Sequence, residues 1–169
     1  IGNRVKANED TVNQMVAQGC QVANHTYDHQ YLSSLGRERM QQQIGAASQA
    51  VLDACGVLPV LVRPPGGKTN RQALTMLETM GFPAVLWSVD TKDWQNRDAG
   101  KIVETVLSQV QDGDIVLMHD IYPSTADAAA VIIPALKEKG FQLVTVSELA
   151  SFRGGMMPGR LYRKFSPGS

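Results

Sequence analysis

The feature that most constrains this chain is the alternation along its length of amphipathic helical segments with short apolar runs. Apolar residues at helical spacing predict helices at residues 9–18, 37–55, 70–80, 98–111 and 125–139. Short runs rich in apolar and β-branched residues predict buried strands at residues 20–24, 60–62, 84–89, 114–118 and 142–146. Five strands separated by helices predict an α/β fold with a parallel sheet.

Local stop signals agree with these helix ends. Glycine stands at or shortly after the end of each predicted helix, at positions 19, 56, 81, 113 and 140. Pro134 falls inside the last of these helices, where it is expected to bend or split it.

Unusual polar residues follow four of the predicted strands. His25, Arg63, Asp90 and His119 come directly after the first, second, third and fourth strand. Because the carboxyl ends of parallel strands share one face, we expect these side chains to lie on one rim. The chain has 3 histidines, and all of them fall in the segments at this rim. This concentration favours a functional site over unrelated surface residues.

Composition excludes several broad classes of protein. A chain of 169 residues with 43% hydrophobic residues can bury the core of one domain and is not intrinsically disordered. Its formal net charge of +0 argues against a general nucleic-acid-binding surface. No apolar run approaches the roughly 18 residues that a membrane span needs. We therefore expect neither a nucleic-acid partner nor a membrane span.

The charges are distributed unevenly along the chain. Residues 151–169 carry four basic side chains and no acidic one, and these are Arg153, Arg160, Arg163 and Lys164. We therefore divide the chain into a catalytic-type domain at residues 1–150 and a basic C-terminal tail at residues 151–169. The tail is expected to be a solvated end, with a strip that contacts another chain or an anionic polymer as the alternative.

Four short motifs contain the residues that are candidates for metal binding or catalysis. In His25-Thr26-Tyr27-Asp28-His29, two histidines four apart on a helical turn could ligate one metal ion. The alternative is two unrelated surface histidines. His119, at the end of Leu117-Met118-His119, is a candidate acid or base, although a lone histidine is more often structural.

The two remaining motifs have plain structural alternatives. One of them is Arg63-Pro64-Pro65-Gly66-Gly67. In the functional interpretation its arginine points at a carboxylate and its glycines let a ligand approach the backbone. The alternative is a rigid turn. Asp90-Thr91-Lys92-Asp93-Trp94 places carboxylates beside a flat apolar wall of the kind on which sugars and acetyl groups pack. Alternatively, it is a turn that ends on a core tryptophan.

In their order along the chain, these motifs resemble those of the polysaccharide deacetylase family, the family-four carbohydrate esterases that act on chitin, peptidoglycan or acetylated xylan. The matching segments are HTYDH at 25–29, RPPGG at 63–67, DTKDW at 90–94, LMH at 117–119 and VTVSEL at 144–149. The resemblance runs over residues 1–149. It implies a distorted (β/α) barrel of the polysaccharide deacetylase type and a metal-dependent hydrolysis of N-acetyl or O-acetyl groups on an acetylated carbohydrate polymer.

The resemblance also implies roles for individual residues. His25 and His29 would bind a divalent metal, zinc by implication, which lowers the pKa of bound water and polarises the acetyl carbonyl. His119 would be the general acid, Asp93 would hold it, and Arg63 would position the catalytic carboxylate. The Gly66 N–H would contribute to the oxyanion site, and Trp94 and Leu117 would line the pocket for the acetyl methyl group.

The sequence departs from the family pattern at two places. The family usually has an aromatic residue where this chain has Gly66, which predicts the loss of an aromatic wall from the substrate groove. The family's first motif, Thr-Phe-Asp-Asp-Gly, supplies the catalytic base and a third metal ligand, and no Asp-Asp pair occurs in this sequence. Ile1-Gly2-Asn3-Arg4-Val5 looks like the end of the family's second strand, so the N-terminal strands of the barrel are expected to be missing.

A barrel remnant of this kind would leave open strand edges, and we expect it to fold poorly alone. We therefore hypothesise that a second chain carrying the Asp-Asp motif completes the site. The leading functional interpretation is deacetylation of N-acetylglucosamine units of peptidoglycan or chitin. The alternatives are an O-acetyl-xylan esterase and a non-catalytic carbohydrate-binding or regulatory fragment. The substrate class implies an extracellular or cell-surface location.

Overall fold

The computed structural model describes residues 1–167 and divides the chain into two units. The first unit comprises Ile1–Leu86 and Gly155–Tyr162. The second comprises Trp87–Gly154 and the residues from Arg163 onward. Each unit therefore contains two separate stretches of the sequence.

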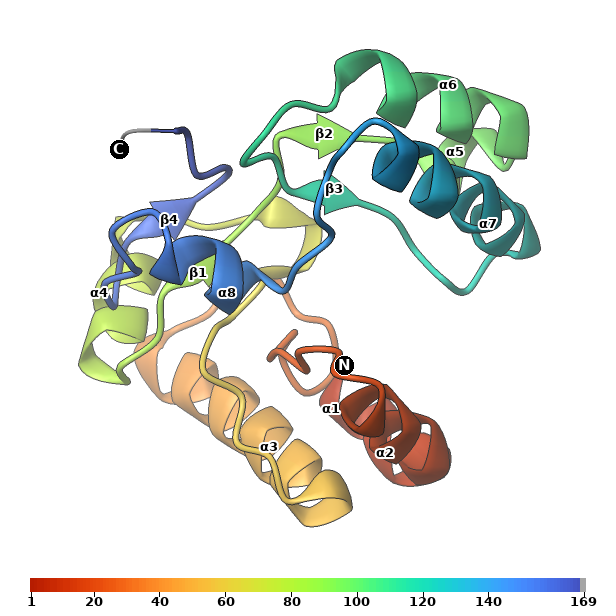
Figure 1. Cartoon of the computed structure of the whole chain (residues 1–169). Coiled ribbons are helices and arrows are strands. Elements are labelled where there is room, and N and C mark those ends of the chain that lie inside the picture. The colour runs from red at the N-terminus through yellow and green to blue at the C-terminus, as the bar shows by residue number, and fades with distance from the viewer. Residues whose placement is uncertain (168–169) are drawn as a thin grey trace. The chain divides into compact units, whose positions relative to one another are not determined.

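The first unit contains helices that pack around one long central helix (Figure 1). Its elements are α1 (Gly2–Val5), η1 (Lys6–Asn8), α2 (Glu9–Ala17), η2 (Leu32–Ser34), α3 (Arg37–Cys55), η3 (Pro65–Gly67), α4 (Arg71–Thr79), β1 (Ala84–Val85) and β4 (Leu161–Tyr162). Helix α3 contacts α1, α2 and α4. It is thus the scaffold on which the N-terminal half of the chain is assembled.

The sequence of α3 explains its central position. Met40, Ile44, Ala47 and Val51 recur every three or four residues and are all buried. Gly56 ends the helix in the left-handed conformation, with φ of 70°, and its N–H donates to the Leu52 carbonyl. The predicted helix at residues 37–55 is confirmed at both ends.

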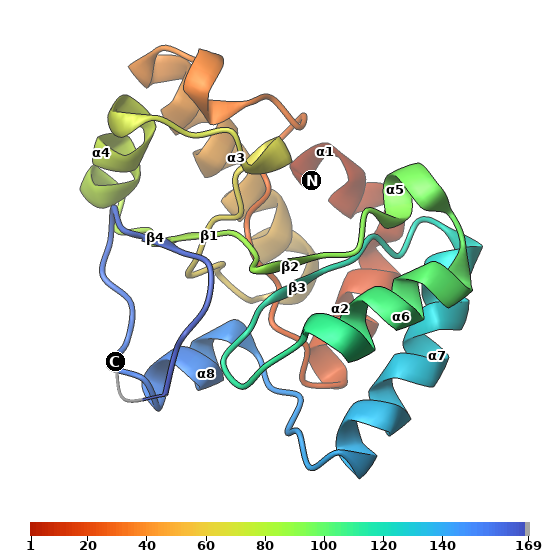
Figure 2. The same ribbon diagram turned by 90° about the horizontal axis from the view of Figure 1, so that it is seen from above.

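The strands of the first unit are short and parallel. β1 lies beside β4 (Figures 1 and 2). The two strands pair with Ala84 opposite Leu161. Single parallel bridges join Asn24 to Val62 and Val62 to Ala84. The strands predicted at residues 20–24 and 60–62 are therefore reduced to one paired residue each. The chain leaves the ladder at Thr26, which has φ of 62°, and at Pro64, which has no N–H to donate.

The second unit also pairs two strands in parallel and covers them with helices. Its elements are β2 (Val89–Asp90), α5 (Asp93–Asn96), α6 (Ala99–Gln109), β3 (Val116–Leu117), α7 (Pro123–Glu138) and α8 (Val146–Ser151). Helices α6 and α7 lie side by side (Figure 2) and bury a cluster of apolar residues. That cluster contains Ile102, Val106, Ala128, Ile132 and Leu136.

Several expectations about individual elements are wrong, although the α/β class and the parallel pairing are confirmed. The segment 84–89 is divided between β1 and β2. No strand forms at residues 142–146, because Thr145 caps α8: its hydroxyl accepts from the Glu148 N–H, and the Glu148 carboxylate accepts from the Thr145 N–H. Pro134 lies within one continuous helix, α7, and therefore does not split it, while the expected bend stays a prediction.

The two ends of the described chain also differ from expectation. Gly2–Val5 is helical rather than the end of a strand. In the basic tail, Leu161–Tyr162 forms β4, and the Phe165 side chain is 3% exposed. Part of the tail, at Leu161–Tyr162 and Phe165, is therefore packed, whereas many of its other described residues are exposed. No helix within residues 1–167 is long and apolar enough to cross a membrane.

Candidate functional site

His25 and His29 lie close together in the first unit. Their ring centroids are 5.0 Å apart, with an angle of 69° between the ring planes. The expectation of a helical turn is wrong, because residues 25–29 form an irregular loop in which Thr26 and His29 have positive φ of 62° and 66°. The loop, rather than helical spacing, brings the two imidazoles together.

The surroundings of His25 suit a metal ligand. Its Nδ1 is hydrogen-bonded to the Arg63 carbonyl, so Nδ1 carries the proton and Nε2 remains available as a ligand atom. Burial, followed by the nearby charge of Arg63, lowers the pKa of His25 to about 3. The imidazole is therefore neutral, as metal binding requires.

Two imidazoles would fill only part of the ligand set of a metal ion. Within residues 1–167, no cluster of three or more His, Cys, Asp or Glu side chains is arranged to hold an ion. Zinc sites in proteins combine imidazole nitrogens with further nitrogen, oxygen or sulfur ligands. The donor set of the described chain thus fits two positions of such a site.

Two buried polar residues that the sequence reasoning missed hold the histidine loop. The Asn24 amide donates to the Ile44 carbonyl and to the Ser48 hydroxyl, both at 2.8 Å, and its oxygen accepts from the Thr26 N–H. The Gln43 side-chain oxygen accepts from the N–H groups of Tyr27 and Asp28, at 3.0 and 3.1 Å. A glutamine inside the apolar stripe of α3 was the available signal.

Arg63 and Gly66 lie on the next loop of the same unit. Arg63 is partly buried, and no acceptor or carboxylate within residues 1–167 pairs with its guanidinium group. Two backbone hydrogen bonds of 3.0 Å close the turn that follows Arg63. The Gly67 N–H donates to the Pro64 carbonyl, and the Lys68 N–H donates to the Pro65 carbonyl. The Gly66 N–H takes no part in these two bonds.

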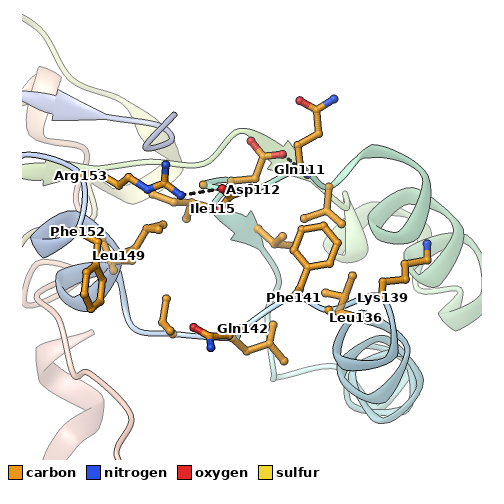
Figure 3. A pocket seen from close by; sticks show the side chains of 18 residues that line it. Gln111, Asp112, Ile115, Leu136, Lys139, Phe141, Gln142, Leu149, Phe152 and Arg153 are labelled. Carbon is orange, nitrogen blue, oxygen red and sulfur yellow. Dashed lines mark hydrogen bonds and ion pairs between the residues drawn. The ribbon is translucent and has the colours of Figure 1, made fainter. Parts of the chain in front are cut away.

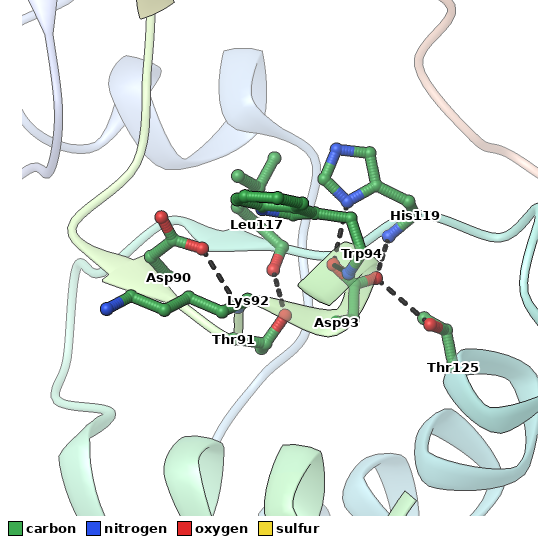
Figure 4. Close-up of polar contacts among 8 residues, drawn as sticks. All are labelled: Asp90, Thr91, Lys92, Asp93, Trp94, Leu117, His119 and Thr125. Carbon is green, nitrogen blue, oxygen red and sulfur yellow. Dashed lines mark hydrogen bonds and ion pairs between the residues drawn. The ribbon is translucent and has the colours of Figure 1, made fainter. Parts of the chain in front are cut away.

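In the second unit, the structure brings Asp93 and His119 into contact (Figure 4). Strands β2 and β3 pair Asp90 with Leu117, so the residues that follow each strand emerge at the same end. His119 Nδ1 lies 2.7 Å from Asp93 Oδ1, and the His119 backbone N–H donates to Oδ2. The carboxylate can only accept, so Nδ1 carries the proton and Nε2 is left free.

Asp93 is completely buried and fully occupied as an acceptor. Besides the two bonds from His119, its Oδ1 accepts from the Trp94 N–H at 3.0 Å and its Oδ2 from the Thr125 hydroxyl at 3.0 Å. Burial by itself raises the pKa of Asp93, but the hydrogen bonds from His119 and Thr125 outweigh it, and the net pKa is lowered. Thr125 is a further positioning residue that the sequence reasoning missed.

The other predicted residues of this unit surround the Asp93–His119 pair. Trp94 is 52% exposed, whereas Leu117 is 7% exposed, and both point to the same side as the His119 ring (Figure 4). The buried Thr91 hydroxyl donates to the Leu117 carbonyl at 2.8 Å. Asp90 accepts from the Lys92 N–H and therefore closes a local turn.

A cavity of about 740 Å³ lies elsewhere in the second unit (Figure 3). Apolar side chains such as Leu136, Phe141 and Leu149 line it, and Arg153 pairs with Asp112 at its edge at 2.7 Å. None of the predicted site residues lines this cavity.

The predicted site residues are thus gathered into two groups. His25, His29, Arg63 and Gly66 belong to the first unit, and Asp93, Trp94, Leu117 and His119 belong to the second. That the two groups share one rim stays a prediction, as do the individual roles.

Comparison with known proteins decides the family. The sequence model described as "Polysaccharide deacetylase" matches residues 1–85. A peptidoglycan-N-acetylglucosamine deacetylase of Bacillus cereus is 36% identical over 158 residues, which cover 90% of this chain and 74% of that protein. This chain belongs to the polysaccharide deacetylase family. The peptidoglycan-N-acetylglucosamine deacetylase PgdA of Listeria monocytogenes is 38% identical over 149 residues, 88% of this chain, but the match spans only 31% of that relative's length.

Solved structures show the deacetylase fold. A structure described as the T48 deacetylase with substrate has a TM-score of 0.89 and 34% identity, covering 96% of this chain and 79% of that one. A family 4 acetyl xylan esterase from Clostridium thermocellum, solved with a cobalt ion, has a TM-score of 0.89 and 26% identity over 97% and 82% of the two chains. A CE4 family pseudoenzyme from Bacillus anthracis has a TM-score of 0.82 and 26% identity over 88% and 52%.

Proposed function

We propose that this chain takes part in the hydrolytic, metal-dependent removal of acetyl groups from a carbohydrate polymer. Among the possible substrates we favour N-acetylglucosamine units of peptidoglycan or chitin over acetylated xylan. The names of the relatives from Listeria monocytogenes and Bacillus cereus support this substrate class.

The contact between Asp93 and His119 carries the proposal. A buried carboxylate on Nδ1 fixes the orientation of the ring. In this proposal His119 acts in its doubly protonated form: Asp93 holds the Nδ1–H, and the Nε2–H gives its proton to the leaving amine.

Residues of the first unit supply the remaining functions in this proposal. His25 and His29 hold a divalent metal, zinc in our assignment, which when bound activates water and polarises the acetyl carbonyl. The Gly66 N–H donates to the developing oxyanion. In the second unit, Trp94 and Leu117 contact the acetyl methyl group.

We further propose that the catalytic base and a third metal ligand come from a separate segment or second chain with an Asp-Asp pair. Three observations support this. The sequence contains no Asp-Asp pair, and the guanidinium of Arg63 has no carboxylate partner within residues 1–167. In addition, large apolar side chains are exposed in the second unit, with Phe152 81% and Leu143 52% exposed. A denaturing intact-mass spectrum of the purified particle tests the idea, since a single species of 18.4 kDa, the mass of this sequence alone, would contradict it.

Acetate release is the direct test of the activity. The intact protein should release acetate from chitooligosaccharide when loaded with zinc, lose this activity in a chelator, and regain it when zinc is added back. His119→Ala should abolish release. Acetate release that is unaffected by the chelator would refute metal dependence, and greater release from acetylated xylan would replace the favoured substrate.

The second candidate is a non-catalytic carbohydrate-binding or regulatory fragment. The absence of an Asp-Asp pair from the sequence favours it, and the family fold also occurs in a protein described as a pseudoenzyme. Under this alternative the protein binds oligosaccharide but releases no acetate under any metal condition. For either function we place the protein outside the cell or at its surface, because the polymers concerned are there. Detection of the protein in the culture medium or on intact cells tests this location.

A further inference from the structure

The ring of Tyr31 lies against Gly66, a contact that neither the motif analysis nor the family comparison assigned. A Cβ atom placed on Gly66 would be 3.1 Å from Tyr31 Cε1 and 3.6 Å from Cζ. Gly66 also has φ of 57°, a conformation that side-chain-bearing residues rarely adopt. The ring therefore occupies the space into which a side chain at position 66 would extend.

Tyr31 is held firmly although its side chain is 47% exposed. Its carbonyl accepts from the Ser34 N–H at 3.0 Å and from the Ser34 hydroxyl at 2.8 Å. The next residue, Leu32, is completely buried in the core of the first unit. Asn70 donates to the Ser33 carbonyl at 3.0 Å and thereby ties the turn to the start of α4. The backbone under the exposed ring is thus fixed at both ends.

The position of Tyr31 places an aromatic face beside the candidate metal loop. Tyr31 follows His29 by two residues, and Gly66 follows Arg63 by three. A half-exposed tyrosine on a fixed backbone, with its ring against Gly66, offers apolar contact area at a low entropic cost, because few side-chain torsions have to be fixed on binding. The C–H face of a sugar ring is the ligand surface that packs on such an aromatic face.

We propose that Tyr31 is a sugar-binding platform that replaces the aromatic wall expected to be lost at Gly66. Its ligand is a pyranose ring of the acetylated polymer, and the glycine is required because the ring fills its side-chain space. This inference rests on the proposed function for the identity of the polymer. It adds a binding residue from a segment outside the four motifs.

The test measures the affinity of the intact protein for an N-acetylglucosamine oligomer by calorimetry, with unfolding temperature as a check on folding. Tyr31→Phe and Tyr31→Leu form a matched pair, since both remove the hydroxyl and only the first keeps the ring. We expect Tyr31→Phe to bind within about twofold of the wild type, and Tyr31→Leu to bind about three- to tenfold more weakly. Leu58→Ala, which shortens an exposed apolar side chain of the first unit that has no proposed role, should leave the affinity unchanged.

A double-variant measurement separates a platform from a residue that merely fills space. Gly66→Ala pushes against the ring and should weaken binding in the wild-type background, but by clearly less when Tyr31 is already leucine. Equal affinities of Tyr31→Leu and the wild type would overturn the proposal, as would a failure of the wild type to bind the oligomer. Binding with the expected pattern but no acetate release would leave the platform standing and remove the proposed hydrolytic activity instead.

Discussion

Asp93 binds His119 twice, once through the ring Nδ1 at 2.7 Å and once through the backbone N–H of the same residue. The carboxylate therefore fixes the start of the His119 backbone together with the direction of its ring. Because Thr125 and the Trp94 N–H occupy the remaining acceptor positions, the carboxylate itself cannot rotate without losing bonds. The imidazole is held in one orientation before any substrate is present.

The first prediction concerns Asp93→Asn. An asparagine carries no negative charge and can turn its NH₂ group toward Nδ1, so it no longer holds the Nδ1–H of the protonated ring that gives its proton from Nε2. We expect kcat for acetate release to fall by about 10²- to 10⁴-fold with little change in KM. Asp120→Asn is the matched control, because Asp120 is the adjacent exposed carboxylate, and it should retain activity. Equal losses in both variants would contradict a specific role for Asp93.

The second prediction follows from the lowered pKa of Asp93. A carboxyl group with a lower pKa in the folded than in the unfolded state stabilises the fold above its unfolded pKa of about 3.9. This contribution is lost as the pH falls through the folded pKa. The free energy of unfolding of the wild type should therefore decline more steeply below about pH 4 than that of Asp93→Asn.

Urea unfolding of both proteins from pH 6 to pH 2 measures this difference. The capping carboxylate Glu148 also has a lowered pKa, because it accepts hydrogen bonds from Thr145, but it is present in both proteins and cancels in the comparison. Parallel curves for the two proteins would show that the Asp93 carboxylate makes no pH-dependent contribution.

The third prediction tests the support of the histidine loop by Gln43. Gln43→Leu nearly preserves the volume but leaves the N–H groups of Tyr27 and Asp28 without their acceptor. We expect a loss of about 1–3 kcal/mol in the free energy of unfolding, together with weaker zinc binding in a calorimetric titration. Gln49→Leu, on an exposed position of the same helix, should change stability by less than about 0.5 kcal/mol. Equal zinc affinities of Gln43→Leu and the wild type would show that Gln43 does not support metal binding by the histidine loop.

The fourth prediction compares two glycines with the same backbone conformation. Gly113 and Gly140 have φ of 87° and 85°, but a Cβ atom on Gly113 would lie 1.8 Å from the Phe165 carbonyl oxygen, whereas nothing lies within 4 Å of one on Gly140. Gly140→Ala should cost about 1–2 kcal/mol from backbone strain alone. Gly113→Ala should cost about 3 kcal/mol or more, because the Phe165 backbone must also move. Similar losses on denaturant unfolding would show that the C-terminal segment does not pack against Gly113.

The sequence predicts the parts of this fold that depend on local signals. Helix α3 has the expected ends because an apolar stripe runs along it and the left-handed Gly56 directly follows its last residue. The strand predicted at residues 142–146 does not form, because two local signals disagree there. Its apolar residues resemble a strand, but the capping pair Thr145 and Glu148 starts a helix at the same place.

The candidate site shows the same division between local and tertiary information. His25, His29, Asp93 and His119 are visible in the sequence because they belong to short motifs. Asn24 and Thr125 are not visible, because each acts through a partner from a distant part of the chain, as in the contact of Asn24 with Ile44. Gln43 is visible only as a polar residue within the apolar stripe of α3, and its partners Tyr27 and Asp28 are not. Tyr31 could not be found either, since only folding brings its ring to Gly66.

The course of the chain between Gly154 and Arg163 limits how this molecule can be dissected. The chain leaves the second unit at Gly155, adds β4 to the first, and returns to the second at Arg163. Neither unit can therefore be obtained by cutting the gene at one point, because truncation after Leu86 removes a strand from the piece that remains. A recombination event or an engineered fusion that exchanges one unit would have to carry two stretches of sequence together. The two units are consequently expected to be inherited and exchanged together.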